Sequence, residues 1–191
     1  MPTSALAAVL RSFGAPHDIA TVSLRDPGEG EVMVRISAAG ICHSDVGQAD
    51  GEWDFQLPTV LGHEGAGVVE DIGPGVTTVS PGDHVILSLA PGCGTCRHCL
   101  DGRPIRCQVS LAAMAAGRLT TGPSPIRLGS QQVAAYSLLS CFAERAVVAE
   151  RSAVPVPPGV PAEVGALIGC AVITGVGAAI ETLQVPVEEV Q

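Results

Sequence analysis

Residues 62–76 read GHEGAGVVEDIGPGV, a valine-containing run that three glycines interrupt within its first six residues. Valine and isoleucine favour the extended conformation, whereas glycine marks irregular places within a strand. The Gly-Pro-Gly sequence at 73–75 is a turn signal. The stretch therefore predicts a strand broken by glycines, which has His63 and Glu64 near its start and ends in a turn.

Short runs of the same kind lie on both sides of this stretch and are separated by Gly, Pro and Asp, as between antiparallel strands. They are ALAAVLRSF, IATVSL, GEVMVRISAAGI, PGDHVILSL and FAERAVVAE, at 5–13, 19–24, 30–41, 81–89 and 142–150. Residues 110–135 mix Ala, Gly, Ser and Pro and predict a surface excursion. A helix is expected from Pro161, because proline in the first turn followed by Glu163 is a helix start signal. The predicted fold class is α+β, mainly β: a small irregular β-barrel with short helices.

Composition limits the classes of partner and the compartment. Hydrophobic residues make up 47 % of the 191 residues but aromatic ones only 3 %, so aliphatic side chains must form the core. The formal charge is 10 − 19 = −9, which argues against nucleic acid or an anionic membrane surface as a partner. No run approaches 18 uninterrupted apolar residues and the first residues lack a basic region, so we expect neither a membrane span nor a signal peptide. These features predict a cytoplasmic protein with reduced thiols.

Four of the seven cysteines lie in the segment 91–107, PGCGTCRHCLDGRPIRC, and these are Cys93, Cys96, Cys99 and Cys107. Disulfides and a metal site are the two interpretations that compete. An odd total of cysteines and a reducing compartment disfavour disulfides. Gaps of two residues turn several thiolates toward one point about 2.3 Å from each sulfur, and four sulfurs in a closed tetrahedron are typical of structural zinc. The segment therefore predicts a zinc-binding lobe.

The remaining cysteines are Cys42, Cys141 and Cys170. Two of them together with His63 would have the composition of a catalytic zinc site, which is two thiolates and one imidazole with a free fourth position. Such ligands come from distant segments of the chain. Their spacing therefore does not prove a site, and from the residues alone a lone Cys42 or Cys170 is more often a core thiol than a ligand.

The stretch at 62–76 resembles the signature of the zinc-containing alcohol dehydrogenases. The residues at its fixed positions are Gly62, His63, Glu64, Gly67, Gly73 and Val76. GICHSD at 40–45 resembles that family's segment with the first catalytic ligand and the proton relay, and the four-cysteine segment resembles its structural zinc lobe. IGCAVITGVGAAI at 168–180 resembles its third-ligand segment, so the match extends over essentially the whole chain in the family's order.

The resemblance implies the chaperonin-10-like (GroES-like) catalytic domain of a zinc-dependent medium-chain alcohol dehydrogenase. Residues 1–160 would form this domain, including the zinc lobe at 91–107. Residues 161–191 would form a helix with the third catalytic ligand and the start of a nucleotide-binding domain. Two zinc ions per chain and NAD(P) are the implied cofactors.

The family's ligand positions are Cys42, His63 and Cys170, so the resemblance makes these the ligands of a catalytic zinc. Asp45 would accept a hydrogen bond from the His63 ring. Glu64 would be a transient ligand or would tune the electric field at the metal. The structural alternative for Asp45 is a turn or cap residue, and that for Glu64 is a salt-bridge partner.

Other positions would serve the proton, the cofactor and the substrate. Ser44 would take the alcohol proton, although a helix cap is its structural alternative. His43 would face the cofactor pyrophosphate, and Thr174, four residues beyond the third ligand and on the same helical face, would touch the nicotinamide side. Many relatives end the proton relay on a histidine at the position that is Gly47 in this sequence, so a direct route to water is expected.

Three side chains fall at positions that line the substrate pocket in relatives: Trp53, Leu89 and Phe142. Each of them is equally a core residue when judged from the residues alone. Cys141 has no role in the family's pattern and is expected to be a core thiol.

GVGAAI at 175–180 matches a dinucleotide-binding fingerprint only in part. Ile180 stands where Gly or Ala is required, and the run lies inside the helical pattern instead of after a strand. Its glycines are expected to serve close helix packing. We expect the Rossmann domain to be absent from this chain, which predicts a fragment, a truncated product or a part that a partner completes.

The implied activity is oxidation of a small alcohol to an aldehyde or ketone with hydride transfer to NAD(P), and full-length relatives are dimers or tetramers. The isolated chain is expected to be inactive. A dehydrogenase of S-(hydroxymethyl)thiols, of the formaldehyde type, has the same ligands and stays an alternative. A non-catalytic zinc-binding module is the alternative from another class. A zinc-free relative of the quinone-reductase type is disfavoured because it would lack both cysteine sets.

Overall fold

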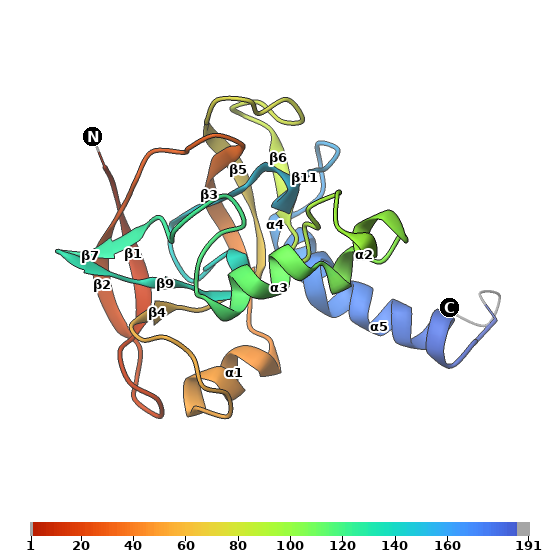
Figure 1. Ribbon diagram of the computed structural model, residues 1–191, viewed down its shortest axis with the longest axis horizontal. Coiled ribbons are helices and arrows are strands. Elements are labelled where there is room, and N and C mark those ends of the chain that lie inside the picture. The colour runs from red at the N-terminus through yellow and green to blue at the C-terminus, as the bar shows by residue number, and fades with distance from the viewer. Residues whose placement is uncertain (1, 187–191) are drawn as a thin grey trace.

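The computed structural model describes residues 2–186, and strands form its body. Two sheets face each other (Figure 1), one with the order β8-β7-β2-β1-β4-β9 and one with the order β10-β3-β5-β6-β11. Neighbouring strands are antiparallel, apart from the parallel pair of β4 and β9. The strands are β1 (Thr3–Leu10), β2 (Asp18–Leu24), β3 (Glu31–Gly40), β4 (Thr59–Val60), β5 (Glu64–Ile72), β6 (His84–Leu87), β7 (Ile126–Leu128), β8 (Gln131–Gln132), β9 (Ala134–Ala135), β10 (Arg145–Ala149) and β11 (Ala153–Pro155).

Short helices connect the strands, and one long helix follows them. The helices are α1 (His43–Asp50), α2 (Arg97–Leu100), α3 (Gln108–Ala115), α4 (Ala162–Leu167) and α5 (Ile173–Gly177), with single 3-10 turns at Pro104–Arg106, Tyr136–Leu138 and Glu150–Ser152. α4 and α5 belong to one continuous helix, Ala162–Thr182, in which π-helical stretches occupy Ile168–Val172 and Ala178–Thr182. The mainly-β class with short helices is as predicted.

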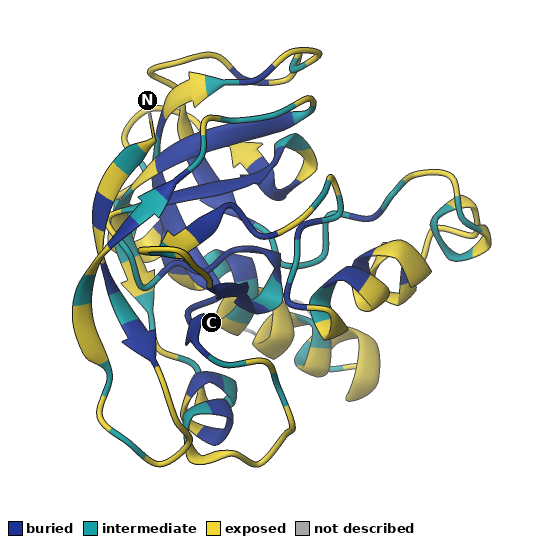
Figure 2. Cartoon of the chain, turned by 60° about the vertical axis from the view of Figure 1, so that its left-hand side comes forward, coloured by how far each residue is buried: buried dark blue, intermediate teal, exposed yellow. Residues whose placement is uncertain are grey.

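The segment 142–144 joins the two sheets into a barrel-like body. Ala8 of β1 donates its N–H to Phe142 O at 2.8 Å, and Ile36 of β3 donates to Glu144 O at 2.9 Å. The two clusters of buried side chains at the sheets are aliphatic apart from one methionine and one cysteine. Aliphatic residues therefore carry the core, as the scarcity of aromatic residues predicts, and Figure 2 shows buried stretches along the inner strands, whereas outer strands are partly exposed.

The pairing of β3 with β5 explains the glycines of the stretch at 62–76. The register places Gly40 opposite Glu64, and it shifts twice along the pair, which is the irregularity that the glycines predict. A Cβ at Gly67 would lie 2.1 Å from Arg35 O, so only glycine lets the two strands approach. The end of β3 and the start of β5 thus lie side by side.

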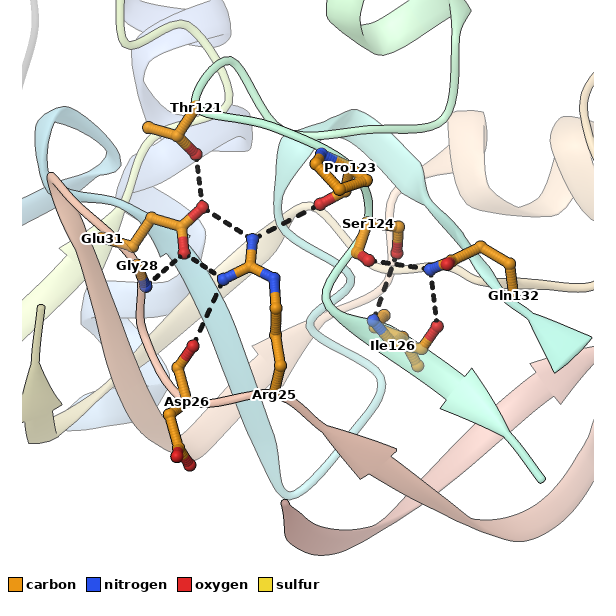
Figure 3. Close-up of polar contacts among 9 residues, drawn as sticks. All are labelled: Arg25, Asp26, Gly28, Glu31, Thr121, Pro123, Ser124, Ile126 and Gln132. Atoms are coloured by element: carbon orange, nitrogen blue, oxygen red, sulfur yellow. Dashed lines mark hydrogen bonds and ion pairs between the residues drawn. The ribbon is translucent and has the colours of Figure 1, made fainter. Parts of the chain in front are cut away.

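A buried carboxylate, Glu31, ties the turn between β2 and β3 to residues near position 121 (Figure 3). It forms an ion pair with Arg25 and accepts hydrogen bonds from Gly28 N at 2.8 Å and Thr121 Oγ1 at 2.5 Å. Burial alone would raise the pKa of Glu31, but these donors, Arg25 first, lower it below its ordinary value. The buried charge of Glu31 is therefore compensated by one ion pair and by hydrogen bonds from the backbone and from a hydroxyl.

The prediction of a surface excursion at 110–135 is wrong. This segment contains most of α3 and the strands β7, β8 and β9, and its residues Leu119, Ile126 and Val133 are buried. Alanine and leucine have high helix propensity, so the residues SLAAMA form a helix although they show no amphipathic pattern. The strands are too short to give a periodic signal and are specified by their pairing with β2 and β4.

The helix predicted from Pro161 begins at Ala162 and leaves the sheets, with most of its outer residues exposed (Figures 1 and 2). Gly175 and Gly177 have open space at their Cβ positions, so the expected close packing of these glycines is not seen among residues 2–186. By length and composition Ala162–Thr182 could cross a membrane, and it is the one such helix in the described chain. One such helix is weak evidence for a membrane span, so the expectation that the protein has no membrane partner stays a prediction.

Candidate metal centres

The four cysteines of segment 91–107 converge in a loop between β6 and α3. Their sulfur atoms all lie within 4.8 Å of one another. Cys96 Sγ is 3.6 Å from Cys99 Sγ and 3.9 Å from Cys107 Sγ. A tetrahedron with metal–sulfur distances of about 2.3 Å has sulfur–sulfur edges of roughly 3.8 Å, whereas a disulfide needs about 2.05 Å. The lobe therefore fits a closed four-thiolate zinc site, and all seven cysteines are free.

Backbone N–H groups point at these sulfur atoms. Cys93 Sγ accepts from Cys96 N at 3.2 Å, and Cys107 Sγ accepts from Cys93 N at 3.2 Å and Ser110 N at 3.5 Å. Hydrogen bonds, that from Thr95 first, lower the pKa of Cys93 to about 5. Cys107 also immediately precedes α3 and caps its first turn, so one residue is both a potential ligand and a helix start.

A second set combines residues from three distant segments. Ligand atoms of Cys42, His63, Glu64 and Cys170 all lie within 4.8 Å of one another. Cys42 precedes α1 after the end of β3, and His63 and Glu64 lie at the start of β5, so the β3–β5 pairing brings them together. The long helix supplies Cys170. The three ligands that the resemblance implies are therefore neighbours, with Glu64 beside them.

Asp45 connects two of these ligands. Its Oδ2 accepts from Cys42 N at 3.0 Å, and its Oδ1 accepts from Gly62 N at 3.1 Å and lies 3.0 Å from His63 Nδ1. The carboxylate is almost fully buried. Because Asp45 can only accept, His63 Nδ1 carries the proton in this contact, and Nε2 is left free for a metal.

The ionisation of the thiols in this second set depends on whether a cation lies among them. Burial alone would raise the pKa of Cys42, but hydrogen bonds from Ser44 and the contact with His63 lower it. Burial first, then the negative charges of Cys42 and Glu64, raises the pKa of Cys170 to about 11. Two thiols and a carboxylate at this spacing do not all ionise unless a positive charge lies among them. The donor set therefore fits a zinc ion.

Cys170 lies in the first π-helical stretch of the long helix, where Gly169 passes against β6. A Cβ at Gly169 would lie 2.3 Å from Leu87 O, so glycine allows the close approach. π-helical turns inside α-helices are frequent at functional sites. The wide turn and the adjacent glycine bring the third sulfur to the other ligands.

A cavity of about 340 Å³ opens beside this set. Ser44, Leu89 and Thr174 line it together with His63 and Cys170. Three of the sequence-predicted residues outside the ligand set thus share one cavity with two of the ligands. Its remaining wall includes Ile105, Met114 and Tyr136, whose sequence context gave no signal.

Residues 28–158 match the model of the alcohol dehydrogenase GroES-like domain. The chain belongs to this family. The family resemblance and the GroES-like fold predicted from it are thereby confirmed.

Members of the family cover most of this chain. An NDMA-dependent alcohol dehydrogenase of Amycolatopsis methanolica is 45 % identical over 88 % of the chain and 45 % of its own length. An S-(hydroxymethyl)glutathione dehydrogenase of Paracoccus denitrificans is 40 % identical over 95 % of the chain and 49 % of its own length. The crystal structure of an alcohol dehydrogenase zinc-binding domain protein from Burkholderia ambifaria superposes with a TM-score of 0.90 at 38 % identity, over 97 % of this chain and 50 % of that one. The chain thus spans about half the length of these relatives.

Within this family fold, three other residues assigned from the sequence are not among those that line the cavity. His43 is exposed at the start of α1. Trp53 is about half exposed, and its carbonyl accepts from Gln48 Nε2 at 3.0 Å. Phe142 packs against a cluster that includes Leu10 and Leu61. The roles of these three residues stay predictions, as does the division of the chain at residue 160.

Cys141 is a core thiol. It is buried in the cluster of the second sheet and lies against Gly65 of β5, where a Cβ would be 2.5 Å from its sulfur. Burial, and then the charges of Asp45 and Glu64, raise its pKa well above the ordinary range. The thiol therefore stays protonated, and it lies outside both ligand sets.

Proposed function

We propose that this chain is the catalytic-domain part of a zinc-dependent alcohol dehydrogenase, which oxidises a small alcohol to an aldehyde or ketone with hydride transfer to NAD(P). The convergence of Cys42, His63 and Cys170 beside a cavity that Ser44 and Thr174 also line carries the proposal. Two thiolates and a neutral imidazole balance the double charge of zinc and leave one position for a substrate oxygen. When bound, zinc would act there as a Lewis acid toward the alcohol hydroxyl.

The residues of the chain have separate tasks in this proposal. Asp45 holds His63 in the tautomer that frees Nε2. The Ser44 hydroxyl, 3.8 Å from Cys42 Sγ, accepts the alcohol proton at the cavity wall. Oxidation removes one proton and one hydride from the alcohol; a bound NAD(P) would supply the hydride acceptor, and Thr174 at the cavity wall would contact its nicotinamide side.

The cavity wall and the sequence around α1 suggest how substrate and proton move. Leu89, Ile105 and Met114 offer an apolar surface for the carbon part of the alcohol. Gly47 has no side chain to continue a relay, so the proton passes from Ser44 to water. The four-cysteine lobe would hold a second zinc, which stabilises the loop and takes no part in the reaction.

Zinc content tests the metal part of the proposal. Elemental analysis of the chain purified without chelator should give about two zinc ions per chain. A zinc content near zero would contradict the proposal.

Turnover tests the catalytic part, in a fusion of this chain to the second half of a full-length relative. We expect NADH formation with primary alcohols, and loss of it in Cys42→Ala. Cys141→Ala is the matched control, since it removes a buried thiol outside both ligand sets. Activity with S-(hydroxymethyl)glutathione but not with simple alcohols would favour the formaldehyde-type alternative. Zinc binding with no turnover in any fusion would favour a non-catalytic module.

A further inference from the structure

Tyr136, the chain's single tyrosine, touches both the proton-accepting side and the metal-binding side of the second site. Its hydroxyl donates a hydrogen bond to Ser44 O at 3.3 Å. Its ring packs near the imidazole of His63, with centroids 5.9 Å apart and planes at 61°. On another side Phe55 meets the ring edge-on, with centroids 5.7 Å apart and planes at 88°. The tyrosine ring is thus held between Phe55 and the ligand His63.

The backbone after Tyr136 adopts conformations that are unfavourable for residues with a side chain. Ser137, Leu138 and Ser140 have positive φ values of 50°, 66° and 55°. The structure has one other non-glycine residue of this kind between positions 2 and 186. Such conformations are unfavourable for residues with a Cβ and persist where the surrounding structure imposes them, often at functional sites. The loop closes on itself through a hydrogen bond from Tyr136 N to Ser140 Oγ at 3.0 Å.

We propose that Tyr136 is a positioning residue for the open metal site. Its hydroxyl holds the first turn of α1, which carries Ser44 and follows Cys42, while its ring holds the imidazole plane of His63. Asp45 fixes Cys42 through its backbone N and His63 through Nδ1, so the tyrosine supplies a second support for His63 and for the turn that follows Cys42. This inference rests on the open zinc site of the proposed function.

A label on the single tyrosine tests the contact without any substitution. The chain is produced with 3-fluorotyrosine, which gives one ¹⁹F resonance from position 136. We expect this resonance to shift when a chelator empties the open site while the lobe keeps its zinc, and to return when zinc is added back. A ¹⁹F chemical shift that stays the same whether the open site is empty or loaded would overturn the proposal.

A pair of variants tests the positioning itself in the cobalt-loaded chain, in which azide can bind only at the open site and change the visible spectrum. Tyr136→Phe keeps the ring and removes the hydroxyl. Thr59→Val is the matched control, because Thr59 Oγ1 is also a buried hydroxyl that donates to a backbone carbonyl. The distance from Thr59 Oγ1 to Ala134 O is 3.0 Å, and neither residue lines the cavity. We expect Tyr136→Phe to alter the azide-dependent spectrum and to weaken cobalt binding at the open site about 5-fold, as loss of one hydrogen bond does, while Thr59→Val matches the wild type at that site.

The outcomes separate this inference from the function on which it rests. If the wild-type chain shows no azide response, the proposed function fails and the inference fails with it. If the wild type responds and Tyr136→Phe is indistinguishable from it, only the inference is overturned. Circular dichroism shows whether Tyr136→Phe folds, and if it does not, the ¹⁹F measurement on the wild type decides.

Discussion

Replacing Asp45 by asparagine should weaken zinc binding at the open site and leave zinc binding in the lobe unchanged. Asp45 Oδ1 serves Gly62 N and His63 Nδ1, and an asparagine oxygen can keep both contacts. The asparagine NH₂ group would then take the place of Oδ2, which now accepts the Cys42 N–H at 3.0 Å. Two donors would face each other at a buried position.

The structure sets the size of the effect. Leaving a buried donor without its acceptor costs about 1–3 kcal/mol, and the negative charge that polarises the imidazole is lost as well. Since 1.4 kcal/mol is about tenfold in an equilibrium constant, zinc affinity at the open site should fall about 10–100-fold. This range is also typical for residues that orient metal-bound histidines.

A competition titration with a chromophoric chelator measures the two zinc affinities of one chain. The four-cysteine lobe is the internal reference, and its affinity should not change. Asp50→Asn is the matched control, because Asp50 is an exposed carboxylate at the other end of the same helix. Wild-type affinity at both sites in Asp45→Asn would refute the role of the carboxylate in holding the imidazole.

Three further predictions concern stability. Cys99→Ser should increase protease cleavage within 91–107, because structural zinc contributes on the order of 10 kcal/mol of local folding energy; resistance equal to the wild type would contradict the closed site. The lowered pKa of Glu31 means that its contribution to stability is complete above its unfolded pKa of about 4.3 and is lost as pH falls through the lower folded value. Urea unfolding between pH 3 and 6 should therefore show a smaller pH dependence in Glu31→Gln than in the wild type, and equal slopes would refute this. Gly67→Ala should destabilise the fold, since its Cβ would lie 2.1 Å from a carbonyl oxygen. Gly175→Ala has open space for its Cβ and should stabilise the helix by about 0.5–1 kcal/mol. Thermal unfolding measures both variants, and equal effects would contradict the different surroundings of the two glycines.

The two metal sets differ in how far the sequence predicts them. The lobe is local: four cysteines within fifteen positions, with glycines between them, converge through the geometry of a short loop. The second set depends on the register of β3 against β5 and on the path of the long helix. Spacing contains no information about these long-range contacts, so Cys42 and Cys170 were assigned only through the family resemblance.

Some residues of the cavity were not predicted from the sequence, because their positions depend on long-range contacts or on strained backbone. Tyr136 lines the cavity beside a turn in which Ser137 and Leu138 adopt conformations that their residue types disfavour, so no propensity rule predicts the turn. Met114 reaches it on α3, whose alanine-rich sequence lacks a polar and an apolar face. Gly175 and Gly177 show the opposite case, in which a pattern typical of close packing has no neighbour within reach.

Cys107 connects the four-cysteine lobe to the wall of the cavity. The residue ends the four-thiolate loop and starts α3, and α3 carries Met114 to the wall of the cavity one and a half to two turns later. Losing zinc from the lobe would free the sulfur that anchors this helix start, and the helix could then rotate or fray at the end nearest the loop. We therefore expect loss of zinc from the lobe alone, as in Cys99→Ser, to broaden the range of alcohols that the proposed enzyme accepts. A zinc ion that takes no part in the chemistry would in this way help to set the width of the cavity.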